Sequence, residues 1–369
     1  MTTLRFHAPY MEWAKMRPAA RLDLAGSNMC ACSIDELPGV REAISFEGHN
    51  ENGYAPLLEA IAARYGVDAN CVTTAQGASG ANFLAFAALL EPGDEVLVET
   101  PGYDPLLGAP RLLGAGVNRF EREFARGFGL DPDRVRRAMT PRTRIIIITN
   151  PHNPSGVLAD PAAIDEIGDI ARVNGAYVLV DEVYLDVAAA AAPRGANVER
   201  TFAGRGDPFV CTNSLTKSYG LSGLRCGWIL SSAEVAERIR RTRDVVDGTG
   251  SIVAERLAVV AFNHLERLVQ RSLSLLETNR PLLKSFLESR TDLESAPSGG
   301  TVVFPRLKHV ADTMEFADRL LRTRDTAVVP GAFFQAPAHV RIGFGGPTET
   351  LRKGLAAIGQ ALDEMSGAV

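Results

Sequence analysis

The sequence predicts an α/β protein organised around a mostly parallel, buried sheet. Short apolar runs rich in β-branched residues alternate along the chain with longer stretches of helical periodicity, as expected of an α/β sheet. The clearest run, at residues 144–149, contains four consecutive isoleucines. Such an unalternating run fits a parallel strand that is buried on both faces. At 369 residues the chain is long enough for a large core and a second domain.

The composition excludes several classes of function. Hydrophobic residues make up 46% and charged residues 22% of the chain, and the formal net charge is −5. Because there is no basic block, we expect no nucleic-acid partner. No apolar run is long enough to cross a membrane, and the N-terminus lacks a signal peptide's apolar centre, so we expect a cytoplasmic protein. The odd count of five cysteines indicates reduced thiols. We interpret the close pair Cys30 and Cys32 as small buried or site-lining residues, since no Cys/His cluster has metal-ligand spacing.

The N-terminal part of the chain predicts a short amphipathic segment and then a helix. Residues 1–20 scatter large apolar side chains among charges, which predicts a segment packed on another surface. A lid over a site is the alternative. Residues 53–66 carry apolar side chains at helical spacing and predict a helix that includes Tyr54 near its start. Packing and ligand contact both stay open for this tyrosine.

A candidate phosphate site follows the next predicted strand. A strand over 71–74, a turn of small residues and a helix over 82–90 come in that order. Free amides and the positive end of the helix dipole favour an anion at such a turn. The turn contains Gly77, Ala78 and Ser79. Glycine-rich turns are common, so this pattern alone is a weak signal.

Polar residues also follow two further predicted strands. The strand at 144–149 leads into an Asn-Pro-His-Asn-Pro-Ser-Gly turn, whose prolines and glycine aim the amide of Asn153. A helix cap is the alternative for that amide. The strand at 177–180 ends at Asp181. Because ligands of doubly wound sheets bind beyond the carboxyl ends of strands, these side chains are expected at one site. An ATPase magnesium site is rejected, since the chain has no Gly-x-x-x-x-Gly-Lys-Ser/Thr loop.

The most specific pattern lies in the loop between the apolar runs at 209–211 and 228–230. Lys217 follows Ser214 and Thr216 and precedes Arg225. A lysine amine forms an imine with an aldehyde, while hydroxyls and a guanidinium suit a phosphate. The loop therefore predicts a site for a phosphorylated carbonyl compound. A solvated Lys–Arg loop is the alternative.

The C-terminal part predicts helices and a strand that carries an arginine. Helices are expected over 234–247 and 251–290, with Pro281 breaking or kinking the second. Arg341 lies among apolar residues of a predicted strand. A buried arginine needs an anionic partner, because burying its charge alone is expensive. That partner is a ligand or, alternatively, an acid of the protein.

The pattern Ser-x-x-Lys-x-x-Gly-x-x-Gly-x-Arg-x-Gly-Trp, at residues 214–228, resembles the pyridoxal-phosphate lysine motif of the class I/II aminotransferases. The Asn-Pro turn, the aspartate and the C-terminal arginine are its companions in the expected order. The resemblance covers nearly the whole chain, from about residue 20 onward. It implies the fold-type I architecture, with a mostly parallel seven-stranded sheet in a large domain at 41–280. Residues 1–40 and 281–369 would form a smaller α/β domain.

Several residue roles follow only from this resemblance. Asp181 would lie against the pyridine nitrogen and keep it protonated, so that the ring stores carbanion electrons. Tyr184 would contact the phenolic oxygen, and Tyr103 would stack on the ring. Asn153 would donate to the phenolate oxygen and to a substrate carboxylate. Arg341 would pair with the substrate α-carboxylate through two parallel hydrogen bonds.

The resemblance also implies partners and a reaction. The substrates would be an α-amino acid and a 2-oxo acid, and the amino group would move through a Lys217 imine of pyridoxal phosphate. Lys217 would carry the proton between Cα and the cofactor as base and acid. The protein would be a homodimer in which Tyr54 reaches the phosphate of the neighbouring subunit. Asn28 is expected near the substrate by its position.

Three alternatives remain on the sequence alone. A pyridoxal-phosphate β-lyase or decarboxylase would use the same cofactor residues. A histidinol-phosphate-type aminotransferase would bind a phosphate at Arg341, where the resemblance places the substrate carboxylate. A non-catalytic ligand-binding protein is the alternative from another class, and the retained Lys217 argues against it. Residues 25–30 contain no arginine that demands a dicarboxylic substrate, so the donor and acceptor stay open.

Overall fold

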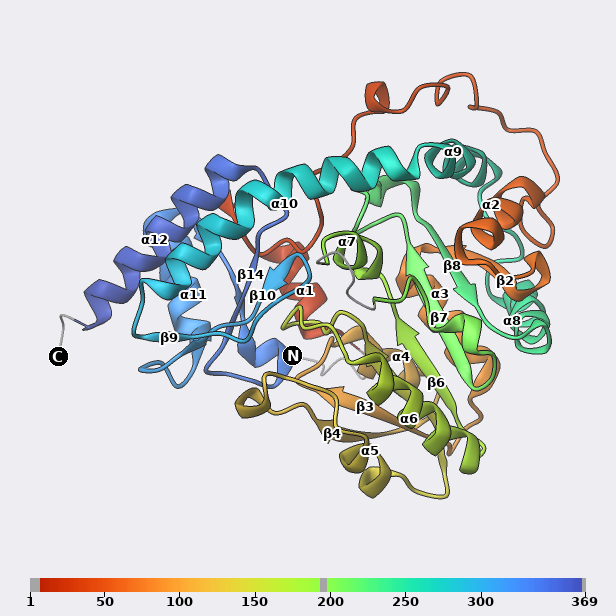
Figure 1. Ribbon diagram of the computed structural model, residues 1–369, viewed down its shortest axis with the longest axis horizontal. Helices are drawn as coiled ribbons and strands as arrows, with labels where there is room; N and C mark the ends of the chain where they lie inside the picture. Colours follow the sequence, from red (N-terminus) through yellow and green to blue (C-terminus); the bar gives the residue numbers. More distant parts are fainter. Residues whose placement is uncertain (1–6, 193–197, 367–369) are drawn as a thin grey trace.

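A seven-stranded sheet forms the centre of the larger part of the molecule in the computed structural model, which describes residues 7–192 and 198–366 (Figure 1). The strands lie in the order β2, β8, β7, β6, β5, β3, β4, and within this sheet only β8 runs antiparallel to its neighbours. Their bounds are β2 (Val72–Gln76), β3 (Glu95–Thr100), β4 (Gly116–Glu121), β5 (Thr143–Thr149), β6 (Tyr177–Asp181), β7 (Phe209–Ser214) and β8 (Cys226–Leu230). The predicted mostly parallel, seven-stranded sheet is confirmed.

Helices cover this sheet and continue into the C-terminal part of the chain. They are α1 (Pro9–Met16), α2 (Ala55–Tyr65), α3 (Gly77–Leu89), α4 (Pro105–Leu112), α5 (Pro132–Ala138), α6 (Pro161–Val173), α7 (Leu185–Ala190), α8 (Ala233–Val246), α9 (Ile252–Asn263), α10 (Leu265–Glu288), α11 (Thr313–Arg324) and α12 (Thr348–Ser366). Within the described residues, none of them combines the length and apolar character needed to cross a bilayer.

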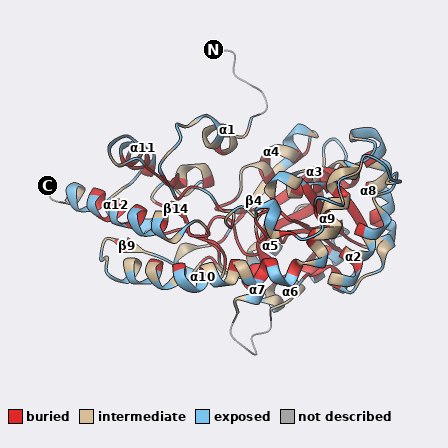
Figure 2. Ribbon diagram, turned by 90° about the horizontal axis from the view of Figure 1, so that it is seen from above, coloured by how far each residue is buried: buried red, intermediate tan, exposed pale blue. Residues whose placement is uncertain are grey.

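The isoleucine run of β5 shows why the central sheet is buried on both faces. Ile146 and Ile148 pack into one hydrophobic cluster, and Ile145 and Ile147 pack into another. All four side chains have no exposed surface. Successive side chains of a strand point to opposite faces, so both faces of β5 must be covered. Figure 2 shows the buried residues concentrated in the sheet and exposed residues on the outer helix faces.

The C-terminal part has smaller sheets and a core of its own. The remaining strands are β1 (Leu22–Asp23), β9 (Leu293–Glu294), β10 (Val302–Val303), β11 (Arg306–Leu307), β12 (Thr326–Ala327), β13 (Val329–Pro330) and β14 (Val340–Gly343). β10, β14 and β13 form a three-stranded sheet, and β1 pairs with β12 in parallel. Leu24 and Met29 pack into the same cluster as residues of α11 and α12. The N-terminal segment thus joins the C-terminal part, although the domain boundaries at 40 and 280 stay predictions.

The expected helices need two corrections. α3 begins at Gly77 rather than at Asn82, so the small-residue turn is the first turn of the helix. The predicted helix over 251–290 is divided at His264, and α10 continues through Pro281. Of the two predicted effects of Pro281, the break is therefore wrong, and the kink stays a prediction. A proline removes one backbone donor, and the packing of Leu276 and Leu283 on either side holds the helix together.

Candidate active site

The loops at one edge of the central sheet converge on a cavity of about 460 Å³. β2, β3, β5, β6 and β7 all end at this edge, and β8 begins there because it runs the opposite way. The predicted site residues that line the cavity are Ala78, Ser79, Tyr103, Asn153, Asp181, Tyr184, Ser214, Thr216, Lys217, Arg225 and Arg341. Side chains that are far apart in the sequence are brought together because parallel strands deliver their carboxyl ends to the same place.

One end of the cavity is built to hold an anion. α3 begins at Gly77 without a side-chain cap, which leaves its first amides free to donate. Gly77 has φ +70°, and a Cβ there would collide with the guanidinium of Arg225. Arg225 donates from Nη2 to the carbonyl of Gln76 at 3.3 Å, which holds it beside this turn. Ser214 and Thr216 line the same cavity. Free amides, hydroxyls and a guanidinium are the donors that a phosphate requires.

Lys217 lines the same cavity. Its Nζ donates to Ser27 Oγ at 3.0 Å and to Asn28 Oδ1 at 2.6 Å. The pKa of Lys217 is lowered to about 7, chiefly because burial disfavours the charge and then because Arg341 repels it, while Asp181 acts in the opposite direction. A lysine with this pKa has a substantial neutral fraction at neutral pH, so it can act as a nucleophile or a base.

Asp181 lies at the carboxyl end of β6 and is fully enclosed. Its Oδ2 accepts from Asn82 Nδ2 at 2.9 Å, and Asn82 Oδ1 in turn accepts from Thr212 Oγ1 at 2.6 Å. Its other oxygen accepts from the amide of Val183 at 3.2 Å. Burial raises the pKa of Asp181, while the bond from Asn82 opposes that rise. The carboxylate is thus held in one orientation and has no cation bonded to it among the described residues, so it is available to a cationic ligand atom.

Arg341 also lines the cavity and is fully buried. Its Nη1 donates to Asn153 Oδ1 at 3.0 Å, and its Nη2 donates to Tyr10 Oη at 2.6 Å and to the carbonyl of Ala25 at 3.1 Å. It has no ion pair with an acid within residues 7–192 and 198–366, and its Nε has no partner there. The salt bridge that the sequence left open is therefore absent from the described part of the chain, and the guanidinium remains available to an anionic ligand.

The hydroxyl of Tyr184 donates to Ser27 Oγ at 2.9 Å, and the same oxygen accepts from Lys217. Burial raises its pKa to about 12, so the phenol stays protonated and can donate. Tyr103 lies beside α1, where its hydroxyl is 3.4 Å from the Met11 sulfur. Its ring meets that of Tyr10 edge-on at 5.8 Å between centroids.

Three predicted residues do not line the cavity, and the first is Gly77, at the start of α3. Tyr54 precedes α2, and its amide donates to Glu255 at 2.9 Å. Asn28 is the third, although it bonds Lys217 directly. Ser27 lines the cavity, and both Ser27 and Asn28 accept hydrogen bonds from Lys217, while the predicted approach of residues 25–30 to the substrate stays a prediction. Cys32 packs behind the loop, where its amide donates to Gly220 at 2.9 Å.

Sequence reasoning missed other residues of the cavity. Asn82 was only a residue of a predicted helix, although an asparagine among apolar helix residues is a signal for a buried hydrogen bond. Thr149 and Lys15 also line the cavity. Tyr10 was assigned to a packing segment, and nothing in its local pattern indicates that it reaches Arg341.

Glu182, next to Asp181, faces away from the cavity and has a different environment. Its Oε1 accepts from the amide of Phe202 at 2.8 Å, while its Oε2 has no partner. Burial raises its pKa from 4.5 to about 8. The folded protein therefore holds a proton that the unfolded chain loses above pH 4.5, so stability falls as pH rises from there toward 8.

Glu182→Gln should remove this pH dependence, because the amide mimics the protonated acid. Relative to wild type, the variant should gain up to about 1 kcal/mol of unfolding free energy per pH unit across that range. Urea denaturation at pH 5, 6.5 and 8 measures this difference. A difference that stays constant with pH would show that Glu182 ionises normally.

The fold and the cavity agree with comparisons to known proteins. The family model "Aminotransferase class I and II" matches residues 39–358. The chain therefore belongs to the class I and II aminotransferase family, and its cofactor is pyridoxal phosphate. The donor set fits this cofactor: free amides and Arg225 suit its phosphate, Lys217 its aldehyde and Asp181 its ring nitrogen.

The similar proteins include a synthase, an aminotransferase and a cyclase. The chain is 33% identical to capreomycidine synthase of Streptomyces vinaceus, over 96% of this chain and 93% of that protein. A PLP-dependent aminotransferase from Streptococcus suis has a TM-score of 0.89 and 27% identity, covering 99% of each chain. The PLP-dependent cyclase OrfR has a TM-score of 0.87 and 28% identity, also covering 99% of each chain.

Proposed function

We propose that this enzyme transfers the amino group of an α-amino acid to a 2-oxo acid. The observation that carries the proposal is Arg341, a buried guanidinium that lines the same cavity as Lys217 and lacks a protein carboxylate. An α-carboxylate would give it a planar partner with two acceptors. Both substrates of a transamination have this group, so one guanidinium serves both halves of the reaction.

Each remaining residue has a role that its position supports. Pyridoxal phosphate supplies an aldehyde that binds amines and a cationic ring that accepts electrons from the substrate Cα. Asp181 would hold a proton on the ring nitrogen, and Tyr184 would donate to the phenolic oxygen. Lys217 would take the proton from Cα and deliver it to the cofactor, and its lowered pKa suits both steps. Ser27 and Asn28 would orient the lysine amine, because they accept its hydrogen bonds.

Arg341→Lys tests the carboxylate site. Lysine keeps the charge but loses the planar fork, so kcat/KM for an α-amino acid should fall. The expected fall corresponds to a loss of about 2–5 kcal/mol in transition-state binding. The measurement compares an amino acid with its decarboxylated amine in both proteins. Cofactor binding should be unchanged, since Arg225 is assigned to the phosphate. If both substrates lose activity equally, Arg341 is structural.

A cyclase is the second candidate, and the likeness to the PLP-dependent cyclase OrfR over 99% of the chain favours it. A cyclase closes a ring within one substrate and consumes no amino acceptor. The two functions are separated by assaying a panel of amino donors with and without 2-oxoglutarate or pyruvate. Turnover that requires the 2-oxo acid supports transamination. Turnover without it would instead identify a cyclase, lyase or decarboxylase.

We also propose a cytoplasmic homodimer with Tyr54 acting across subunits. Tyr54 lies outside the cavity of its own chain, which leaves its hydroxyl available to a second subunit. The nearby segment exposes Ile44 by 50% and Phe46 by 88%, which are apolar side chains suited to an interface. Mixing Tyr54→Phe protein, which should have lowered activity, with inactive Lys217→Ala protein tests this arrangement. Hybrid dimers that regain activity support it, whereas two monomers by sedimentation would exclude it.

A further inference from the structure

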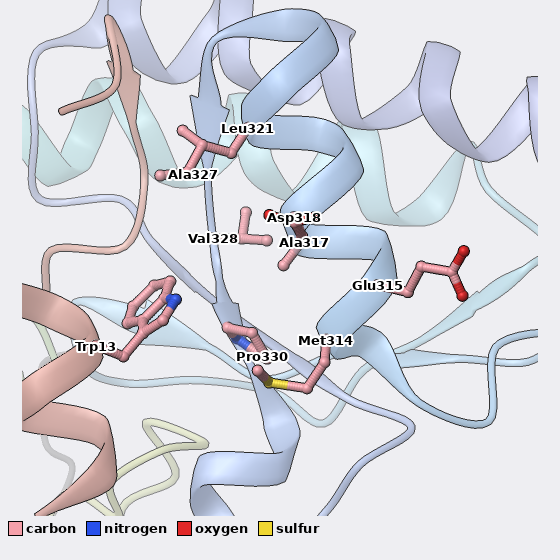
Figure 3. Close-up of a pocket in the computed structure, with 9 residues that line it drawn as sticks. All are labelled: Trp13, Met314, Glu315, Ala317, Asp318, Leu321, Ala327, Val328 and Pro330. Atoms are coloured by element: carbon pink, nitrogen blue, oxygen red, sulfur yellow. The ribbon is translucent and has the colours of Figure 1, made fainter. Parts of the chain in front are cut away.

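Helix α1 presents one face to the active-site cavity. Tyr10, Met11, Ala14 and Lys15 line the cavity, and their spacing places them on one side of the helix. The opposite side carries Trp13, which points toward α11 and the segment around Val328, between β12 and β13 (Figure 3).

Contacts on both sides hold α1 in this orientation. Toward the cavity, the hydroxyl of Tyr10 accepts from Arg341 at 2.6 Å. Away from it, Trp13 lies 5.4 Å from the ring of Phe333, and Arg17 sits 5.3 Å from the centre of the Trp13 ring. Arg17 also bonds Asp23 at 2.5 Å. These contacts within the protein therefore orient α1, and no ligand is needed to turn this face toward the cavity.

The cavity contains an unbalanced positive charge. Four basic side chains line it, namely Lys15, Lys217, Arg225 and Arg341, against one carboxylate, Asp181. The proposed function gives three of these cations a partner in the cofactor or in the substrate α-carboxylate. Lys15 is left over. Within the described residues its side chain has no ion pair or hydrogen bond, and the only acid that lines the cavity, Asp181, is bonded to Asn82 and to the amide of Val183 instead.

We propose that Lys15 selects substrates that carry a second, distal carboxylate. The proposal rests on the proposed function, because it takes Arg341 as the site of the α-carboxylate. Tyr10 contacts Arg341, and Lys15 lies five residues further along the same helix, about 7.5 Å along its axis. A flexible lysine at that place reaches back toward the far end of a substrate anchored at Arg341. Its ammonium then pairs with an anionic side chain, and it repels a cationic one.

This assignment supplies the specificity signal that residues 25–30 lack. Those residues contain no arginine, but the cation comes instead from α1, a segment that joins the cavity only when the chain folds. The preferred donors would be dicarboxylic amino acids, and the preferred acceptors would be dicarboxylic 2-oxo acids.

The test compares glutamate with glutamine, which share size and shape but differ in the distal charge. Wild-type holoenzyme should prefer glutamate. Lys15→Met keeps the chain length and removes the charge, so its kcat/KM for glutamate should fall about tenfold, as for a lost hydrogen bond between charged groups. Its kcat/KM for glutamine should stay within about twofold, and Lys15→Arg should retain most of the preference.

A matched control removes the same charge elsewhere. Lys353→Met changes an exposed lysine of α12 that does not line the cavity, and it should leave the glutamate preference intact. Spectral titration of the holoenzyme gives dissociation constants for both amino acids without requiring turnover. A charge preference in binding without amino transfer would therefore refute the transaminase proposal but support Lys15. A Lys15→Met variant that loses glutamate and glutamine equally, or a wild type that prefers glutamine, would overturn the role of Lys15.

Discussion

Lys217→Ala should reduce turnover on the order of 10⁴-fold or more while the holoenzyme still forms through the phosphate and ring contacts. The loss is large because one amine serves as covalent anchor of the cofactor and as the base that moves the Cα proton. Arg225, the amides of α3 and Asp181 are untouched by the change, so cofactor affinity should fall far less than activity. The measurement is steady-state turnover together with cofactor binding by absorbance.

The covalent assignment can be checked independently of activity. Borohydride reduction of the wild-type holoenzyme should attach the cofactor irreversibly to Lys217, and peptide mapping would locate it. Lys15 is a useful internal control, because it also lines the cavity. A label found on Lys15, or on any lysine other than Lys217, would overturn the assignment.

Asp181→Asn should lower activity on the order of 10²–10³-fold, as for the loss of one well-placed electrostatic group. The amide has the same shape but no charge, so the ring nitrogen would be protonated less readily and would accept less negative charge. The bond from Asn82 fixes the carboxylate, and the variant should keep its cofactor. Steady-state kinetics with saturating pyridoxal phosphate measures the effect.

Glu182→Gln is the matched control for Asp181→Asn, because the adjacent carboxyl faces Phe202 rather than the cavity. Its activity should stay near that of wild type. Equal losses in the two variants, or near-normal turnover of Asp181→Asn, would exclude the role given to Asp181.

The sequence was most informative where function depends on a local pattern at the end of a strand. The loop around Lys217, the Asn-Pro turn and Asp181 each follow a strand directly, and parallel strands bring such ends together. Burial on both faces of the sheet was readable from the isoleucine run of β5. These features depend on neighbours in the chain, so a single sequence reveals them.

The missed features depend on contacts between distant segments. Lys15 and Tyr10 belong to a helix that reaches the cavity only because Trp13 packs against the C-terminal part. Ser27 becomes significant through two hydrogen bonds to residues more than 150 positions away. Pro281 shows the opposite case, in which a strong local signal is overridden by the packing of α10. Periodicity and turn chemistry carry no information about such pairings.

The most direct test of the central claim is a single turnover without an amino acceptor. Holoenzyme mixed with a ¹⁵N-labelled amino acid should release one equivalent of 2-oxo acid per active site and then stop, with the ¹⁵N retained on the enzyme. Adding a 2-oxo acid should release that nitrogen as a new amino acid. Continued turnover without the acceptor, with no ¹⁵N retained, would contradict the transaminase account.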